Sequence, residues 1–112
     1  MAFKGENACQ MWANIKTTGT MTIRDSFNVS SITNAGSNTA RLDLTTSFAD
    51  TNYAVVCSCC EDDNSNTSRT PRNANPTRKR FVTGSVYVNA ARYEEGNSAA
   101  VDQLLVVCFG NQ

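Results

Sequence analysis

The stretch that decides the fold covers residues 24–56 and reads RDSFNVSSITNAGSNTARLDLTTSFADTNYAVV. It is rich in Ser, Thr and Asn, which disfavour helix interiors because their side chains hydrogen-bond to the nearby backbone, whereas Thr suits strands and Asn suits turns. Within it, residues 40–46 alternate, with Leu42 and Leu44 on one side and Arg41 and Asp43 on the other, as in a half-buried strand. This stretch therefore indicates β-structure with many turns.

Similar short runs occur along the rest of the chain, whose 112 residues fit a single domain, residues 1–112, with one core. No window of about 11 residues shows a clean helical period, so we expect an all-β fold, a compact antiparallel β-sandwich of about seven strands. The expected strands are residues 11–16, 20–27, 29–33, 40–46, 53–60, 81–93 and 101–110. Residues 1–10 form an N-terminal extension, and residues 61–80, which hold both prolines, form a long exposed loop.

The apolar pattern predicts how some of these strands are buried. Residues 53–60 and 101–110 carry consecutive apolar side chains, which is typical of strands buried on both faces, and the second of these is expected in the middle of a sheet. Alternation places Met21, Ile23 and Asp25 on one face of their strand. The aromatic residues are interpreted as core rather than as a stacking platform: Trp12, Phe27, Phe48, Tyr53, Phe81, Tyr87 and Phe109.

Residues suited to catalysis are sparse. The sequence has no histidine, which removes the commonest general base, the Ser-His-Asp and Cys-His arrangements and most zinc sites. The carboxylate clusters at residues 61–63 and 94–95 fall in expected turns, where solvated carboxylates make poor acids and bases at neutral pH. Glycine-rich phosphate-binding motifs are also absent. We therefore predict that the protein is not an enzyme and has no catalytic residues, metal site or cofactor.

Five cysteines are many for this length: Cys9, Cys57, Cys59, Cys60 and Cys108. An odd number cannot all pair within one chain, and free buried thiols are expected if the protein is made in a cytoplasm. A disulfide or an intersubunit cysteine contact remains open. The CxxC from Cys57 to Cys60 closes a strand and precedes acidic residues, unlike a redox motif, which opens a helix. Alternation puts Cys60 on the opposite face from Cys57 and Cys59, which divides a possible set of metal ligands.

Charge and hydropathy restrict the partners. Ten basic and ten acidic residues give a net charge of zero, so no bulk attraction to nucleic acid or to an anionic membrane is implied. No apolar run approaches the roughly 20 residues of a transmembrane helix, and the N-terminus lacks the hydrophobic centre of a signal peptide. The basic group of the long loop could contact phosphate, but the preceding acidic group and the lack of aromatics favour contact with another protein, or a plain solvated loop; this group is Arg69, Arg72, Arg78, Lys79 and Arg80. We expect neither nucleic-acid binding nor membrane insertion.

Partner or receptor contacts are expected in exposed loops, where binding residues concentrate. The candidates come from the long charged loop and from two turns: Asp62, Asp63, Arg69, Arg72, Arg78, Lys79, Arg80, Asn34, Ser37 and Asn97.

Part of the chain resembles a module of tailed-bacteriophage fibre proteins. The matching residues are WANI at 12–15, GT at 19–20, IRDSFNVSSIT at 23–33 with a glycine turn after it, ADTNYAVV at 49–56 and LLVVCFG at 104–110. The resemblance covers about half of the chain, residues 11–56, and touches its end. The run from Asn28 to Thr33 after Ile-Arg is its most specific part.

The resemblance implies a small β module on the virion of a tailed phage, usually trimeric and near the end of a tail fibre. Such a protein is made in the host cytoplasm without a signal peptide and attaches to a host surface receptor or to other virion proteins, such as the fibre, the tail or the major capsid protein. The chain departs from the module by lacking the preceding fibrous region and by its CSCC run and charged loop. The alternative is a capsid decoration protein bound to the major capsid protein. Less favoured are an intracellular redox enzyme and a nucleic-acid binder.

Overall fold

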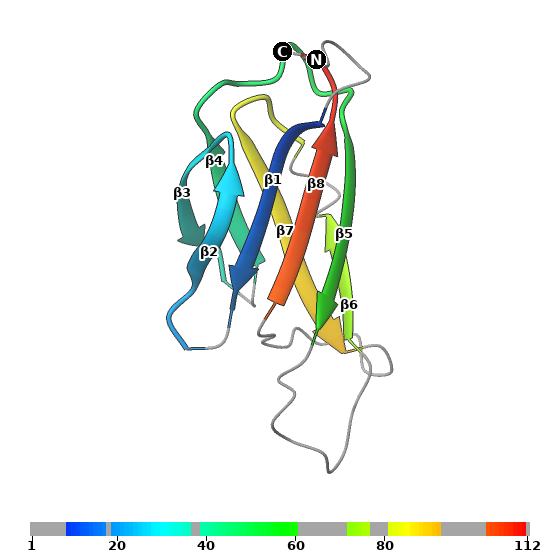
Figure 1. Cartoon of the computed structure of the whole chain (residues 1–112). Helices are drawn as coiled ribbons and strands as arrows, with labels where there is room; N and C mark the ends of the chain where they lie inside the picture. The colour runs from blue at the N-terminus through cyan, green and yellow to red at the C-terminus, as the bar shows by residue number, and fades with distance from the viewer. Residues whose placement is uncertain are drawn as a thin grey trace.

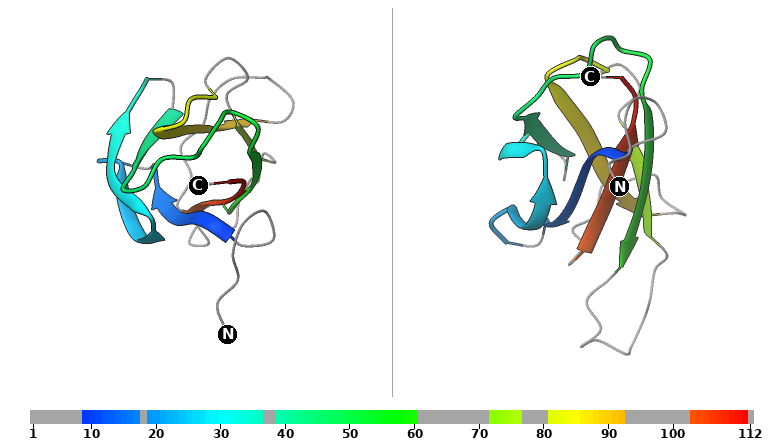
Figure 2. Two further views of the ribbon diagram at one scale, coloured as in Figure 1. Left: turned by 90° about the horizontal axis from the view of Figure 1, so that it is seen from above. Right: turned by 45° about the horizontal axis from the view of Figure 1, so that its top comes forward.

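Two antiparallel sheets packed face to face make up the described part of the chain. The computed structural model describes residues 9–17, 19–36, 39–60, 72–76, 81–92 and 103–111. These residues form eight strands: β1 (Cys9–Lys16), β2 (Thr22–Phe27), β3 (Val29–Asn34), β4 (Thr39–Leu44), β5 (Ala54–Cys60), β6 (Arg72–Pro76), β7 (Ser85–Arg92) and β8 (Gln103–Phe109). Sheet A has the order β2-β1-β8-β5 and sheet B the order β3-β4-β7-β6. Figures 1 and 2 show the two layers. The predicted all-β antiparallel fold is confirmed.

The strand that the sequence did not predict is β6. Residues 61–80 are expected to form one long loop, and this is wrong for Arg72–Pro76, which pair with β7 from Arg72↔Arg92 to Pro76↔Val88. Backbone pairing makes this strand, and its proline is tolerated because β6 lies at the edge of sheet B. Residues 61–71 and 77–80 lie outside the described residues. The expected N-terminal extension is also too long, since β1 already begins at Cys9.

The core comes from the two central strands of each sheet. β1 and β8 face β4 and β7 across the sandwich (Figure 1). The fully buried large side chains, each less than 2% exposed, all lie on these four strands: Met11, Ile15, Leu42, Val86, Val88, Leu104, Val106 and Cys108. The prediction that the last strand lies in the middle of a sheet is confirmed, because β8 is bonded to β1 and β5.

In contrast, β5 is not buried on both faces. It lies at the edge of sheet A and pairs with β8. Val55 and Cys57 are half-buried and pack against the core, whereas Val56 is 60% exposed and Ser58 is also exposed. The expectation for residues 53–60 is therefore wrong, because no described element covers the outer side of this strand.

A β-bulge decides which side chains of β2 face the core. Asn14 pairs with Asp25 but Ile15 pairs with Ile23, so Arg24 is an extra residue in β2. The extra residue reverses the alternation, and Asp25 is exposed while Ile23 packs against the core. The prediction that Ile23 and Asp25 share a face is wrong for this reason.

Asn28 holds the corner where the chain crosses from sheet A to sheet B. Its φ of 61° is left-handed, a conformation that Asn tolerates better than most residues. Its Nδ2 donates to the main-chain oxygens of Gln10 and Thr46, both at 3.0 Å. Its Oδ1 accepts a hydrogen bond of 2.7 Å from the main-chain nitrogen of Thr46. One side chain therefore ties β1 to the segment that follows β4.

The connection from β4 to β5 crosses the end of the sandwich (Figure 1), and Tyr53 anchors it. Its ring stacks on Phe48, with centroids 4.1 Å apart, and contacts Phe81 at 5.0 Å. Its hydroxyl donates to the main-chain oxygen of Val82 at 3.0 Å, and burial raises the pKa of Tyr53 to about 12. Gly110 passes so close that an added Cβ would lie 2.7 Å from Tyr53 Cβ. This end of the sandwich therefore requires glycine at residue 110.

Candidate interaction surfaces

The outer face of sheet A carries a row of apolar side chains. One row of paired residues crosses all four strands, from Phe27 of β2 through Trp12 of β1 and Val107 of β8 to Val56 of β5. Phe109 lies two residues beyond Val107 on the same strand and face. The exposed fractions are 52% for Phe27, 37% for Trp12, 60% for Val56 and 40% for Phe109. We name these five residues the apolar face.

The apolar face is a candidate binding surface. It holds four of the five exposed large hydrophobic residues found in the described part of the chain, the other being Val82. An aromatic side chain has roughly 150–250 Å² of surface, so the exposed fractions give a contiguous patch of about 300–400 Å². Single exposed apolar residues are ordinary, but patches of this size on small proteins are often functional.

The aromatic residues divide among the core, this face and the outer face of sheet B, where Tyr87 pairs with Arg41 and the core prediction is wrong; Phe81 is half-buried and packs against the core as predicted. Phe48 and Tyr53 are buried, which confirms the prediction for them. The same prediction is wrong for Trp12, Phe27 and Phe109, which point outward from sheet A. The structure thus assigns to a surface the side chains that sequence reasoning assigned to the core.

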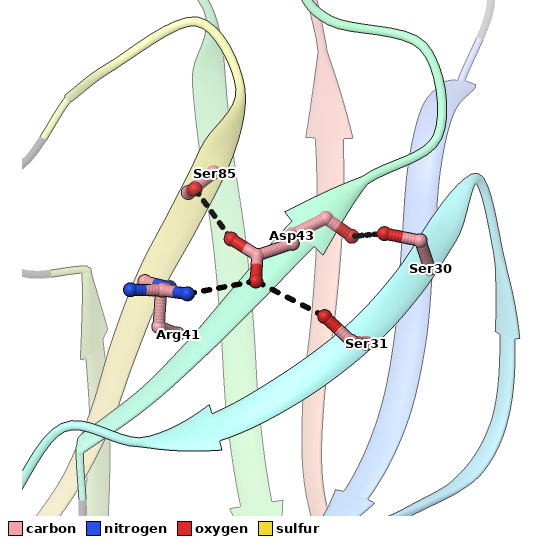
Figure 3. Close-up of polar contacts among 5 residues, drawn as sticks. All are labelled: Ser30, Ser31, Arg41, Asp43 and Ser85. Carbon is pink, nitrogen blue, oxygen red and sulfur yellow. Dashed lines mark hydrogen bonds and ion pairs between the residues drawn. The ribbon is translucent and has the colours of Figure 1, made fainter.

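The outer face of sheet B is polar and is centred on Asp43 of β4. Asp43 Oδ2 accepts hydrogen bonds from Arg41 Nη2 and Ser31 Oγ, both at 3.0 Å, and Oδ1 accepts one from Ser85 Oγ at 2.8 Å (Figure 3). Ser30 Oγ donates to the main-chain oxygen of Asp43 at 3.1 Å. The network connects β3, β4 and β7 across the sheet, and we name it the Asp43 network.

These contacts define the charge state of Asp43. The hydrogen bond from Arg41, followed by that from Ser85, lowers the pKa of Asp43, and the hydrogen bond to the carboxylate raises the pKa of Arg41. Each contact favours the ionised carboxylate, which makes Asp43 a weak base at neutral pH. The arrangement is suited to linking β3, β4 and β7 on a solvent-exposed face.

Cys57, Cys59 and Cys108 lie towards the core, whereas Cys9 is half-buried and pairs with Phe109. Burial raises the pKa of Cys108 to about 12 and also raises the pKa of Cys57. Cys9 Sγ donates to the main-chain oxygen of Met11 at 3.2 Å. Cys9, Cys57, Cys59 and Cys108 form no disulfide, and in residues 9–17, 19–36, 39–60, 72–76, 81–92 and 103–111 no three His, Cys, Asp or Glu residues are placed to hold a metal ion. A buried thiol with a raised pKa is a poor nucleophile.

Most of the predicted contact residues lie outside the described residues: Asp62, Asp63, Arg69, Arg78, Lys79, Arg80, Ser37 and Asn97. The two described ones are far apart, because Arg72 belongs to β6 and Asn34 to β3, at opposite edges of sheet B. Asn34 Oδ1 accepts a hydrogen bond of 2.8 Å from the main-chain nitrogen of Gly36, whose φ is 92°. Asn34 therefore shapes the predicted glycine turn.

Comparison with known proteins gives no relative for this chain. No family model, no curated protein sequence and no solved structure matches it. Across the residues that the structure describes, no helix is long and apolar enough to cross a membrane. The two contrasting faces of the sandwich are thus the observations on which an inference of function rests.

Proposed function

We propose that this chain is a non-enzymatic structural protein of a tailed-phage virion, a tail-fibre-like surface module that attaches to other virion proteins or to the host. The observation that carries this proposal is the contrast between its two outer faces. The apolar face exposes side chains that are stabilised when another protein covers them, whereas the Asp43 network is stable in water. A subunit of a particle needs both kinds of surface.

The resemblance to phage fibre modules supports the same proposal. Its most specific run begins at Asn28, whose left-handed backbone and three hydrogen bonds join the two sheets. Its second segment, residues 49–56, contains Tyr53, which anchors the β4–β5 connection. The resemblance therefore rests on positions that this sandwich requires, and not on general richness in Ser, Thr and Asn.

The titratable groups on the described strands support contact rather than chemistry. The carboxylate of Asp43 is engaged by three donors, and the thiol of Cys108 is buried with a raised pKa. Host or virion contacts by charged residues are proposed for the segments on either side of β6, residues 61–71 and 77–80, which include Asp62, Asp63 and Arg78. Segments that connect the strands of a rigid scaffold commonly carry such contacts.

Locating the chain on purified particles tests the proposal. Phage particles from cells that produce this chain are banded on a density gradient, and the chain is quantified by mass spectrometry against the major capsid protein. A low, fixed ratio supports an appendage module, and a ratio approaching that of the capsid protein supports the decoration alternative. A chain that is abundant in infected cells but absent from the particles refutes both.

A further inference from the structure

The apolar face is ordered so that it fits a second copy of itself. Along the row, the two bulky side chains, Phe27 and Trp12, occupy β2 and β1, and the two small ones, Val107 and Val56, occupy β8 and β5. The row is therefore thick over one half of sheet A and thin over the other half. The boundary between the halves lies between β1 and β8, which is the middle of this four-stranded sheet.

A two-fold rotation about an axis parallel to the strands, placed at that boundary, brings the thick half over the thin half. The rotation reverses strand order but keeps every row at its own height, so β2 lies over β5 of the second copy and β1 over β8. Phe27 then faces Val56 of the second copy, and Trp12 faces Val107. Each bulky side chain meets a small one, which fills the roughly 10 Å between stacked sheets evenly.

The other two-fold arrangement fits less well. An axis perpendicular to the strands would place Phe27 over Phe27 and Val56 over Val56, which crowds one end and leaves a gap at the other. The strand-parallel axis also suits the two ends of the next row, in which Asp25, Asn14, Leu105 and Ser58 are paired across the sheet. There it brings the exposed carboxylate of Asp25 over the hydroxyl of Ser58, which can donate a hydrogen bond.

Area and charge are compatible with this contact. Four strands about 4.8 Å apart and about seven residues long give a face of roughly 19 by 24 Å, so two faces bury on the order of 1,000 Å², near the lower limit for a specific interface. The chain has a net charge of zero, so two copies do not repel each other. Both conditions are met without any change in the sandwich.

We propose that the protein forms a two-fold symmetric dimer through the outer face of sheet A, with Phe27 packed on Val56 of the second copy. The symmetry makes the contact self-complementary, since each copy contributes the same face. The proposal of a dimer is based on the strand register and the exposed side chains of sheet A, and it goes beyond the virion role proposed above. It also differs from the trimer that the fibre-module resemblance implies.

Charge substitutions at the two ends of the row test the pairing. Phe27 and Val56 lie three strand spacings apart, about 14 Å, so they cannot pair within one chain. Phe27→Glu and Val56→Lys each bury an unpaired charge in the contact, and each is expected to raise the dimer Kd at least about tenfold. The double variant F27E/V56K places Glu against Lys at both ends, and its Kd is expected to return to within a few-fold of wild type. Val82→Lys, at an exposed valine outside the apolar face, leaves the Kd unchanged.

Sedimentation velocity from about 1 to 100 µM measures these constants, with circular dichroism confirming that each variant is folded. Wild type is expected to reach twice the 12.2 kDa mass of the chain, a result that requires no variant. A wild-type mass of one chain or of three chains at the highest concentration overturns the proposal. The proposal is also overturned if the double variant dimerises no more tightly than the weaker-binding of the two single variants. Loss of the dimer from a chain that still co-purifies with virions would leave the virion proposal standing.

Discussion

Replacing Asn28 tests how the two sheets are joined. Asn28→Ala removes its three hydrogen bonds to Gln10 and Thr46 and places alanine at a φ of 61°. A hydrogen bond contributes about 0.5–1.5 kcal/mol net, and a left-handed conformation costs a non-glycine residue about 1–2 kcal/mol. Two of the bonds are solvent-exposed, so values at the lower end apply, and we expect the free energy of unfolding to fall by about 2–3 kcal/mol.

Asn28→Gly separates the two contributions. Glycine loses the same hydrogen bonds but adopts positive φ without strain, so it should be less harmful than alanine by about 1 kcal/mol. Asn34→Ala, which loses one exposed bond to Gly36, is the control and should cost about 0.5 kcal/mol.

Equilibrium urea unfolding followed by circular dichroism measures these differences, at one fixed protein concentration because association adds to apparent stability. In thermal unfolding, Asn28→Ala should lower the Tm by about 8–12 °C. The reasoning is refuted if Asn28→Ala costs no more than Asn34→Ala, or if glycine at this corner is more destabilising than alanine.

Three further predictions concern the Asp43 network, a buried thiol and a close backbone contact. Because the pKa of Asp43 is lowered in the folded state, its contribution to stability is present above the pKa of unfolded Asp, about 3.9, and is lost as the pH falls through the folded value. The urea midpoints of wild type and Asp43→Asn should therefore differ at pH 7 and converge in acid. A difference between the midpoints that persists in acid contradicts this prediction. Cys108, with its pKa raised to about 12, should resist alkylation by iodoacetamide at pH 8 until urea unfolds the chain, and mass spectrometry that shows it labelled in the native state would disprove its burial. Gly110→Ala, whose Cβ would lie 2.7 Å from Tyr53 Cβ, should cost about 1–3 kcal/mol in urea unfolding, whereas in Gly84→Ala the nearest atom is at 3.5 Å and the cost should be small; equal costs would contradict the contact.

The sequence predicts strands better than it predicts their outer faces. In β1 the buried side chains alternate as Met11, Ala13 and Ile15, which makes the strand recognisable. In β8 both phases are apolar, and alternation cannot tell that Val107 and Phe109 face outward. Whether an outer face is covered depends on other elements of the fold, and strand periodicity carries no information about them.

The periodicity of apolar residues also cannot predict local backbone irregularities or contacts between residues that are far apart in the sequence. The bulge at Arg24 inserts one residue and reverses the alternation without any sequence signal. The strand β6 is defined by its backbone pairing with β7, and its residues carry no apolar alternation from which the strand could be predicted. Arg41 and Asp43 were correctly placed on one face of a strand, but Ser85, which is 42 positions from Asp43, becomes a partner only through the register of β4 and β7.

The fluorescence of Trp12 tests most directly whether the apolar face is covered by a second copy. Trp12 is the only tryptophan in the chain, lies within the row of bulky and small residues, and is 37% exposed in a single copy. We predict that its emission shifts to shorter wavelength as the protein concentration rises, and that Val56→Lys keeps the emission at longer wavelength over the same range. Emission that is independent of concentration in wild type, or a shift that persists unchanged in Val56→Lys, would contradict the proposed dimer.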